Sequence, residues 1–369
     1  MIRDTFPIFR HGLLPAIQGF DVDTWKHGES NGSHPRCGAR RGHETCDVSV
    51  EVSIQLEAAR ALDQHVIGIA MDCRKCFDLL PESICFSLLS HQGARNYVID
   101  TERRFYRQLR SMYQVAGTLS PYNTRRDGFV QGCSFSLQAV QGLLAVRTRY
   151  IESTNAIPPI ITTSGFLDDN NMRCQATHAS DAAHALETAW SRSQEFDEFS
   201  GIQTNFQKTV VFANTHVAER LARKMFCCGD TPLALKRSFL LVGGVITTMG
   251  KPATSYRNFG ITKAIKKIKR SRYAPVSFQQ KAHLIAAACL PMAVYGSELQ
   301  LPTQDQFAQL RRAVSAAMFK GFTWCRSPVL AVSLILPGQR VDAKALRALF
   351  EVAWTFVVPR QCKTTGLVA

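Results

Sequence analysis

The sequence predicts an α+β fold in which a β-sheet is flanked by helices. Short runs rich in β-branched residues, typical of strands, alternate with longer segments of helical periodicity. Two of these runs, 66–71 and 160–165, lead into aspartate at or near their ends. The second reaches the adjacent pair Asp168 and Asp169, whose carboxylates repel each other when both are ionised. This pair therefore favours a site that binds cations over a turn that is purely structural.

Charge and composition narrow the class of function. The chain has 369 residues, a net charge of +15 and 46% hydrophobic residues, which is enough for a sizeable core. The excess of Lys and Arg predicts a polyanionic partner, nucleic acid before membrane, with a generic basic surface as the alternative. No run reaches the roughly 18–20 apolar residues of a membrane span, and the N-terminus lacks an apolar signal core. We therefore expect an intracellular protein that is not secreted.

The predicted elements of the first half can be taken in chain order. Residues 1–50 are rich in Pro, Gly, His and Ser and lack periodicity, so we expect an irregular segment. Pro81 suits the first turn of a helix and Gly93 suits its end. The other apolar periods predict helices at 47–62, 81–92, 98–114 and 133–147, and strands at 66–71, 160–165 and 170–174. The last two strands form a hairpin with both aspartates at its turn.

The second half continues the alternation of helices and strands. A helix is predicted from a cap at Ser180 to a stop at Gly201. Strands are expected at 209–212 and 238–242, and a final helix with a short tail from about Gly338.

A long segment of one charge sign lies within this half. From Thr231 to Ser297 the chain has no Asp or Glu, whereas Lys and Arg recur, with a basic helix near 258–272. Such a run would repel itself without anions, which favours phosphate contact over a merely solvated surface. The predicted nucleic-acid contacts of this helix are Lys263, Lys266, Lys267, Lys269 and Arg270.

Four blocks follow one another along these elements, at 72–78, 128–136, 166–169 and 201–209. In this order they resemble the reverse transcriptase patterns Asp-x4-Phe-Asp, Gly-Val-x-Gln-Gly-x-Pro-x-Ser-Pro, aromatic-x-Asp-Asp and Gly-Leu-x-x-Asn-x-x-Lys-Thr. Each block alone is common, but all of them in order are specific. Cys133 after Gln-Gly and the segment at 291–296 are similar to the subtype encoded by non-LTR (LINE-like) retrotransposons.

The resemblance implies a right-hand polymerase with an antiparallel palm sheet and flanking helices, partial fingers and a helical thumb. It implies RNA-directed DNA synthesis with two Mg²⁺ ions, or Mn²⁺ in their place. The implied partners are an RNA template, a DNA primer and a dNTP, with no membrane; it also allows a nuclear location. We divide the chain into 1–50 with a fingers remnant, a palm with partial fingers at 51–230, a basic thumb-like region at 231–330 and a C-terminal helix and tail at 331–369.

The resemblance also carries roles over to single residues. Asp72, Asp168 and Asp169 become the metal ligands, and the backbone carbonyl of Cys73 an additional one. Lys208 becomes the group that protonates or neutralises the leaving pyrophosphate. The alternative to the metal-ligand role is that these aspartates simply end their strands, and the alternative for Lys208 is an ordinary solvated lysine.

Three further residues belong to the predicted substrate site. Phe77 stands where the family places an aromatic ring beneath the sugar, which would crowd a 2′-hydroxyl and favour deoxynucleotides. Gln131 and Gly132 precede a helix N-terminus, where backbone amides favour anions, and would contact nucleotide or template. The alternatives are a core phenylalanine and a polar residue that caps the helix.

Two departures keep other functions open. Ser134 and Leu137 replace the two prolines of the second block, and the family's fingers begin upstream of anything recognisable here. A palm that only binds nucleic acid is therefore an alternative, as is an intron maturase, although no recognisable domain follows the thumb. The spacing His34-x2-Cys37-x5-His43-x2-Cys46 is compatible with zinc, but its short inner loop favours coincidence.

Overall fold

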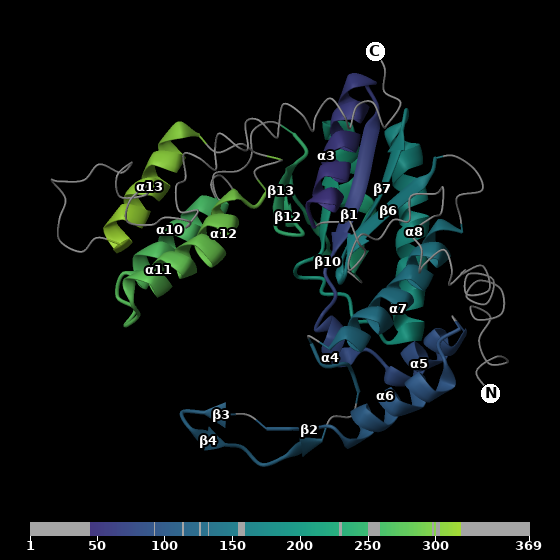
Figure 1. The fold of residues 1–369 in the computed structure, drawn as a ribbon. Coiled ribbons are helices and arrows are strands. Elements are labelled where there is room, and N and C mark those ends of the chain that lie inside the picture. The colour runs from purple at the N-terminus through teal and green to yellow at the C-terminus, as the bar shows by residue number, and fades with distance from the viewer. Residues whose placement is uncertain are drawn as a thin grey trace. The chain divides into compact units, whose positions relative to one another are not determined.

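The computed structural model describes residues 45–318, apart from 92, 113, 125–126, 132, 154–158, 229–230, 250–258, 297–298 and 300–302. These residues form two compact units (Figure 1). The first holds the residues up to Val242 together with 247–249, and the second holds 243–246 and the residues from Phe259 onwards. The zinc-like spacing and the predicted C-terminal helix lie outside the described residues, except for Cys46.

The centre of the first unit is a five-stranded sheet, which confirms the predicted α+β class. Its strand order is β11-β8-β1-β7-β6. The strands are β1 (His65–Met71), β6 (Ile161–Phe166), β7 (Asp169–Ala176), β8 (Val210–Ala213) and β11 (Ala234–Leu235). The prediction of an antiparallel sheet is wrong at one edge, because β11 runs parallel to β8. A parallel neighbour needs a crossover connection, and the helix α9 (His216–Met225) lies between these two strands in the chain.

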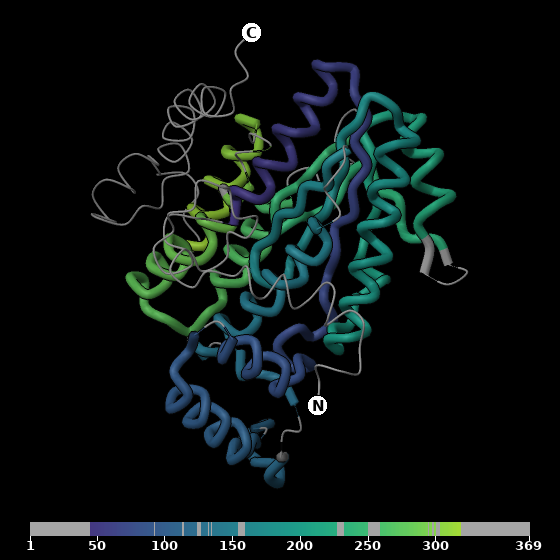
Figure 2. Tube along the Cα trace, turned by 90° about the vertical axis from the view of Figure 1, so that its right-hand side faces the viewer, coloured from purple at the N-terminus to yellow at the C-terminus, as the bar shows by residue number. Residues whose placement is uncertain are grey.

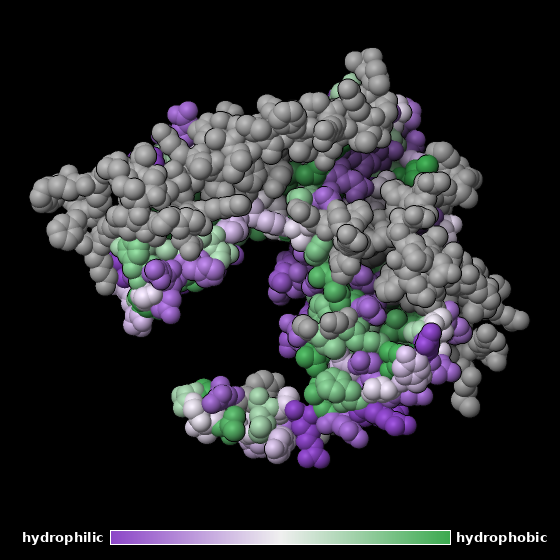
Figure 3. All heavy atoms as spheres, in the orientation of Figure 1, coloured by the Kyte–Doolittle hydropathy of each residue, from purple (hydrophilic) through white to green (hydrophobic). Residues whose placement is uncertain are grey.

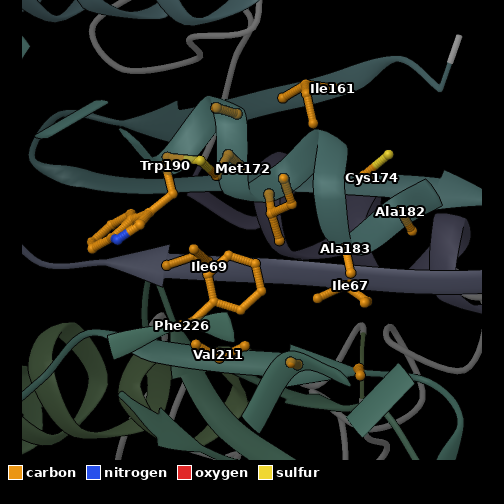
Figure 4. Packing of buried hydrophobic residues seen from close by; sticks show 14 of the residues in the cluster. Ile67, Ile69, Ile161, Met172, Cys174, Ala182, Ala183, Trp190, Val211 and Phe226 are labelled. Carbon is orange, nitrogen blue, oxygen red and sulfur yellow. The ribbon is translucent and has the colours of Figure 1, made fainter. Parts of the chain in front are cut away.

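Helices α8 (Ala179–Ser200) and α9 pack on one face of the sheet. Alternate residues of β1 point to this face, so that Ile67 and Ile69 meet Ala183 and Phe226 in one buried cluster (Figure 4). Helix α8 ends at Gly201, whose φ of 73° is the left-handed stop that the sequence predicted. The predicted cap at Ser180 is wrong: the helix begins at Ala179, His178 is its N-cap, and Ser180 is helical.

Helix α3 (Thr45–Ala61) packs against β1 and β6 on the side that α8 and α9 leave open. A buried cation holds it there. Arg173 of β7 donates to Glu51 Oε1 at 2.5 Å and also binds Gln55, both on α3. The helix predicted at 47–62 is thus confirmed, and it begins at Thr45, within the last residues of the segment at 1–50 that was otherwise predicted to be irregular.

Beyond the end of the sheet where β1 terminates lies a helical cluster (Figures 1 and 2). It comprises α4 (Cys76–Leu79), α5 (Glu82–His91), α6 (Asn96–Gln108) and α7 (Ser134–Glu152). Aromatic rings form its core: Phe129 lies edge-on to Tyr106 at 5.1 Å and to Phe86 at 5.9 Å. This core joins α5 and α6 to the segment that leads into α7.

One predicted helix is shorter than expected. The segment at 98–114 was predicted to be helical throughout, but α6 ends at Gln108 and Leu109 is extended. The chain continues as a hairpin of β2 (Arg110–Ser111), β3 (Gln114–Val115), β4 (Thr118–Leu119) and β5 (Asn123–Thr124). Its turn uses Ala116 and Gly117, both at positive φ, which matches the twist of a two-residue hairpin loop.

The remaining short strands complete the list for the described residues. They are β9 (Cys227–Cys228), β10 (Thr231–Pro232), β12 (Ser238–Leu241) and β13 (Gly244–Thr247). The strand predicted at 238–242 is thereby confirmed.

The second unit is helical and has its own core. Helix α10 (Phe259–Ser271) packs through Ile261, Ala264 and Ile268 against its neighbours. These neighbours are α11 (Phe278–Leu284), the π-helical turn η2 (Ile285–Cys289), α12 (Leu290–Val294) and α13 (Gln304–Met318). Among the described residues, no helix combines the length and apolarity needed to cross a membrane.

The packing around Gly68 gives a test of the central strand. A Cβ atom at this position would overlap the ring of Phe212 on the neighbouring strand β8. That ring is fully buried and stacked on Phe239 at 4.9 Å, so it has little room to move. We expect Gly68→Ala to destabilise the chain by about 1–3 kcal/mol through overpacking.

Thermal unfolding of the variants would measure this effect. In the Phe212→Leu background the smaller side chain leaves room for the added methyl group. There, Gly68→Ala should lower stability by less than it does in the wild-type chain. Equal stability of wild type and Gly68→Ala would contradict the packing described here.

Candidate active site

Asp72, Asp168 and Asp169 lie at the same end of the sheet because of strand register. In the antiparallel pairing of β1 with β7, Met71 lies opposite Asn170. The next residue of each strand in that direction is Asp72 on one side and Asp169 on the other. The β6–β7 hairpin closes with Phe166 paired to Asp169, which leaves Leu167 and Asp168 as its turn. The predicted convergence of the two strand ends is therefore present in the fold.

The electrostatics at Asp169 agree with this closeness. The pKa of Asp169 is raised from its ordinary 3.8 to about 6, first by burial and then by the charges of Asp168 and Asp72. Lys208 acts in the opposite direction and lowers this pKa. Like charges that are partly withdrawn from water disfavour ionisation, which is the signature of a site short of positive charge.

The loop after α8 runs alongside the residues that follow β1. Asn205 N–H donates to the backbone oxygen of Asp72 at 2.7 Å, and its side-chain Nδ2 donates to Asp72 Oδ2 at 2.9 Å. Lys208 Nζ lies 3.3 Å from the other carboxylate oxygen, Oδ1. Its side chain is 67% exposed, so the pair is open to solvent and to a ligand. The predicted catalytic residues Asp72 and Lys208 are thus brought together.

A buried ion pair holds this loop in place. Arg147 of α7 donates to both carboxylate oxygens of Asp197 on α8, at 2.7 and 2.9 Å. Burial lowers the pKa of Arg147, but the charge of Asp197 and the bonds to it outweigh burial and raise the pKa. Asp197 Oδ2 also accepts from Thr204 Oγ1 at 2.8 Å, next to Asn205 in the loop.

The second sequence block lies against the first. Phe129 N–H donates to the carbonyl of Phe77 at 2.5 Å. Gly128, at φ 89°, comes so close to the backbone of Asp78 that a side chain would overlap it. The Phe77 ring is partly buried and packs against the aromatic core, which agrees with its alternative as a core residue and leaves the sugar-contact role a prediction.

Gln131 is exposed just before the N-cap Cys133 of α7, on the side from which the helix starts. Gly132 lies outside the described residues.

The five basic residues predicted to contact nucleic acid lie on α10 in the second unit. All of them are exposed, whereas the opposite side of the helix is buried. The exposed positions are Lys263, Lys266, Lys267, Lys269 and Arg270. Their contact with nucleic acid stays a prediction.

The residues that support Asp72 were not predicted from the sequence. No role was expected for the Asn205 side chain or for Arg147, Asp197 and Thr204. A signal was present, because a charged residue within an apolar helical run, such as Arg147, is almost never buried without a partner. The identity of that partner depends on how α7 and α8 pack.

The donor types of this site suit a magnesium ion. Mg²⁺ prefers carboxylate oxygens and usually keeps other positions for water and substrate phosphates. Among the described residues, no group of three or more His, Cys, Asp or Glu side chains is arranged to hold a metal ion. The Asp72 carboxylate is turned towards Asn205 and Lys208 instead. A site of this kind would need oxygens from the substrate to complete the coordination.

Comparison with known proteins gives distant structural matches only. No family model matches the sequence, and no curated protein matches it. Telomerase from Candida albicans in complex with a TWJ fragment of telomeric RNA is 13% identical, with a TM-score of 0.43 over 90% of this chain and 60% of that one. Apo telomerase from Candida tropicalis, truncated from the C-terminal domain, is 14% identical, with a TM-score of 0.41 over 65% and 45%. The chain spans about half the length of these structures.

The raised pKa of Asp169 predicts a specific pH dependence of stability. Between its ordinary pKa of 3.8 and the folded value of about 6, the folded state binds more protons than the unfolded state. Stability therefore falls as pH rises through this window. We expect Asp169→Asn to remove this loss of folding stability, which amounts to up to about 3 kcal/mol, the equivalent of roughly two pKa units.

Urea unfolding without divalent cations at pH 4 and pH 7 would measure this difference. Asp181→Asn, at an exposed position in the first turn of α8, is the matched control and should keep the wild-type profile. The same pH profile for Asp169→Asn and wild type would show that the carboxylates do not repel one another in the folded chain.

Proposed function

We propose that this chain is the reverse transcriptase of a non-LTR retrotransposon. It would transfer a deoxynucleotide from a dNTP to a primer 3′-hydroxyl on an RNA template. The observation that supports the proposal most is the strand register that sets Asp72 beside Asp168 and Asp169. Four sequence blocks with independent positions in the chain gather around this point, and a coincidental Asp-Asp pair would not explain them.

The carboxylates and the lysine would divide the chemistry between them. Asp72, Asp168 and Asp169 would hold two Mg²⁺ ions, which would supply activation of the hydroxyl and neutralisation of the leaving group. Lys208 would donate a proton to the departing pyrophosphate, since it is exposed yet tied to Asp72 at 3.3 Å. Asn205 would keep the Asp72 carboxylate in one orientation through its bond at 2.9 Å.

The substrate would be chosen and held by the second block and the basic helix. The ring of Phe77 would lie beneath the sugar and crowd a 2′-hydroxyl. Gln131 and Gly132 would contact the nucleotide or template from the N-terminal side of α7. The exposed basic side of α10 would contact the phosphates of the primer and template, since its charges are all of one sign.

A chain that only binds nucleic acid is the second candidate, and Ser134 favours it. This residue stands where the family has proline, and it is the first residue of α7. Proline is favoured at that position, so its absence leaves the preceding loop less constrained. Misplacement by about 1 Å can reduce a rate by on the order of 100-fold. We therefore expect slow synthesis by the wild-type chain and faster synthesis by Ser134→Pro.

Primer extension on poly(rA)/oligo(dT) with Mg²⁺ tests the proposed function. In wild type or in the Ser134→Pro background, Asp168→Asn should reduce extension by at least about 100-fold, because metal ions supply several kcal/mol of barrier reduction. Binding to the same duplex should change little, and Asp181→Asn should extend normally. Template-dependent extension that survives Asp168→Asn would contradict the assignment, and tight binding without extension in both backgrounds would favour the second candidate.

The sugar contact of Phe77 has a test of its own. Phe77→Val should raise the incorporation of ribonucleotides relative to deoxynucleotides, because it removes the clash with the 2′-hydroxyl. Single-nucleotide addition with dTTP and UTP would give the ratio. An active variant with unchanged discrimination would instead make Phe77 a core residue of the helical cluster.

A further inference from the structure

The hairpin at 110–124 is a surface without a role in the proposed chemistry. Its strands β2, β3 and β4 are exposed at both of their residues. Large apolar side chains lie open on it, with Val115 72% exposed and Leu119 56% exposed. In Figure 1 the hairpin extends away from α6, and in Figure 3 hydrophobic and hydrophilic residues alternate over it. A two-stranded hairpin of this kind is only marginally stable alone in water, which indicates a partner.

The charge of this surface selects the class of partner. From residue 103 to residue 124 the sequence has four arginines and no Asp or Glu. Arg104 and Arg107 on α6 and Arg110 on β2 are exposed. A surface of one sign has electrostatic complementarity to a polyanion, whereas a second copy of the same hairpin would bring like charges together.

Aromatic rings on this surface select single-stranded rather than double-stranded nucleic acid. Tyr122 is 66% exposed, and the guanidinium of Arg110 lies over its ring at 5.8 Å from the centroid. Phe105, at the end of α6, is 48% exposed. Exposed rings next to arginines are the arrangement on which unpaired bases stack, and bases within a duplex do not offer their faces in this way.

The hairpin is also connected firmly to the candidate active site. Tyr106, one helical turn before the hairpin, is buried against Phe129 at 5.1 Å. Phe129, just after the hairpin, is bonded to the carbonyl of Phe77. A nucleic-acid strand bound on the hairpin would therefore lie on an element that is fixed at both ends to the residues that follow Asp72.

We propose that the hairpin at 110–124, with the end of α6, binds single-stranded nucleic acid by stacking a base on Tyr122 and pairing phosphates with Arg107 and Arg110. This surface is separate from the carboxylates. Its function does not require that the chain be catalytically active.

Fluorescence anisotropy tests the inference with the full chain, a labelled 20-nucleotide oligo(rU), and EDTA to exclude chemistry. Tyr122→Ala should weaken binding about 5- to 100-fold, the effect of losing one stacked base, and Tyr122→Phe should retain it. Arg110→Gln should lower the dependence of log K on log salt by about 0.7 for one lost phosphate contact. Binding of a blunt DNA duplex should be unaffected by Tyr122→Ala.

Tyr97→Ala is the matched control, because Tyr97 is 65% exposed but lies in the first turn of α6, away from the hairpin. It should bind oligo(rU) like wild type. Unchanged oligo(rU) binding by Tyr122→Ala would overturn the inference, as would an equal loss on duplex or a dimer in sedimentation that Tyr122→Ala dissociates. Failure of primer extension would not affect these results, so the two proposals can fail separately.

Discussion

The antiparallel pairing of β1 with β7 is the constraint on which the candidate site depends. Side chains alternate between the two faces of a strand, so a slip of one residue would exchange the faces of the whole strand. Ile67 and Ile69 would then leave the core under α8, and Gly68 would no longer lie beneath the Phe212 ring. The packing of the sheet thus fixes the register, and the register in turn sets Asp72 beside Asp169.

The same register concentrates negative charge at one end of the sheet, where it does not stabilise the fold. The charges of Asp168 and Asp72 raise the pKa of Asp169, and Lys208, largely exposed, offsets only part of this repulsion. A neutral side chain would suit the folded state better, which makes the carboxylates a cost that binding of cations would remove. The rigid parts lie behind them, where the buried pair of Arg147 and Asp197 holds Thr204 and the loop that carries Asn205.

The strand ends and the aspartates could be predicted from the sequence, because both depend on local patterns. The β-branched run before Asp72 and the hairpin around Asp168 follow from short-range preferences. The bond between Arg147 and Asp197 could not be predicted, since it joins helices 50 residues apart through packing. The end of α6 was misjudged for another reason. Its arginines continue a helical period up to residue 110, while the turn that overrides it lies further on, at Gly117.

Binding of Mn²⁺ followed by electron paramagnetic resonance would show whether the register of β1 and β7 builds a site for divalent cations. The full chain would be titrated with Mn²⁺ in the presence of primer–template duplex and a dNTP analogue that cannot react. We expect bound Mn²⁺ in wild type and in Asp181→Asn, and weaker binding or fewer ions in Asp72→Asn and Asp169→Asn. Equal Mn²⁺ binding by all four proteins would contradict this expectation.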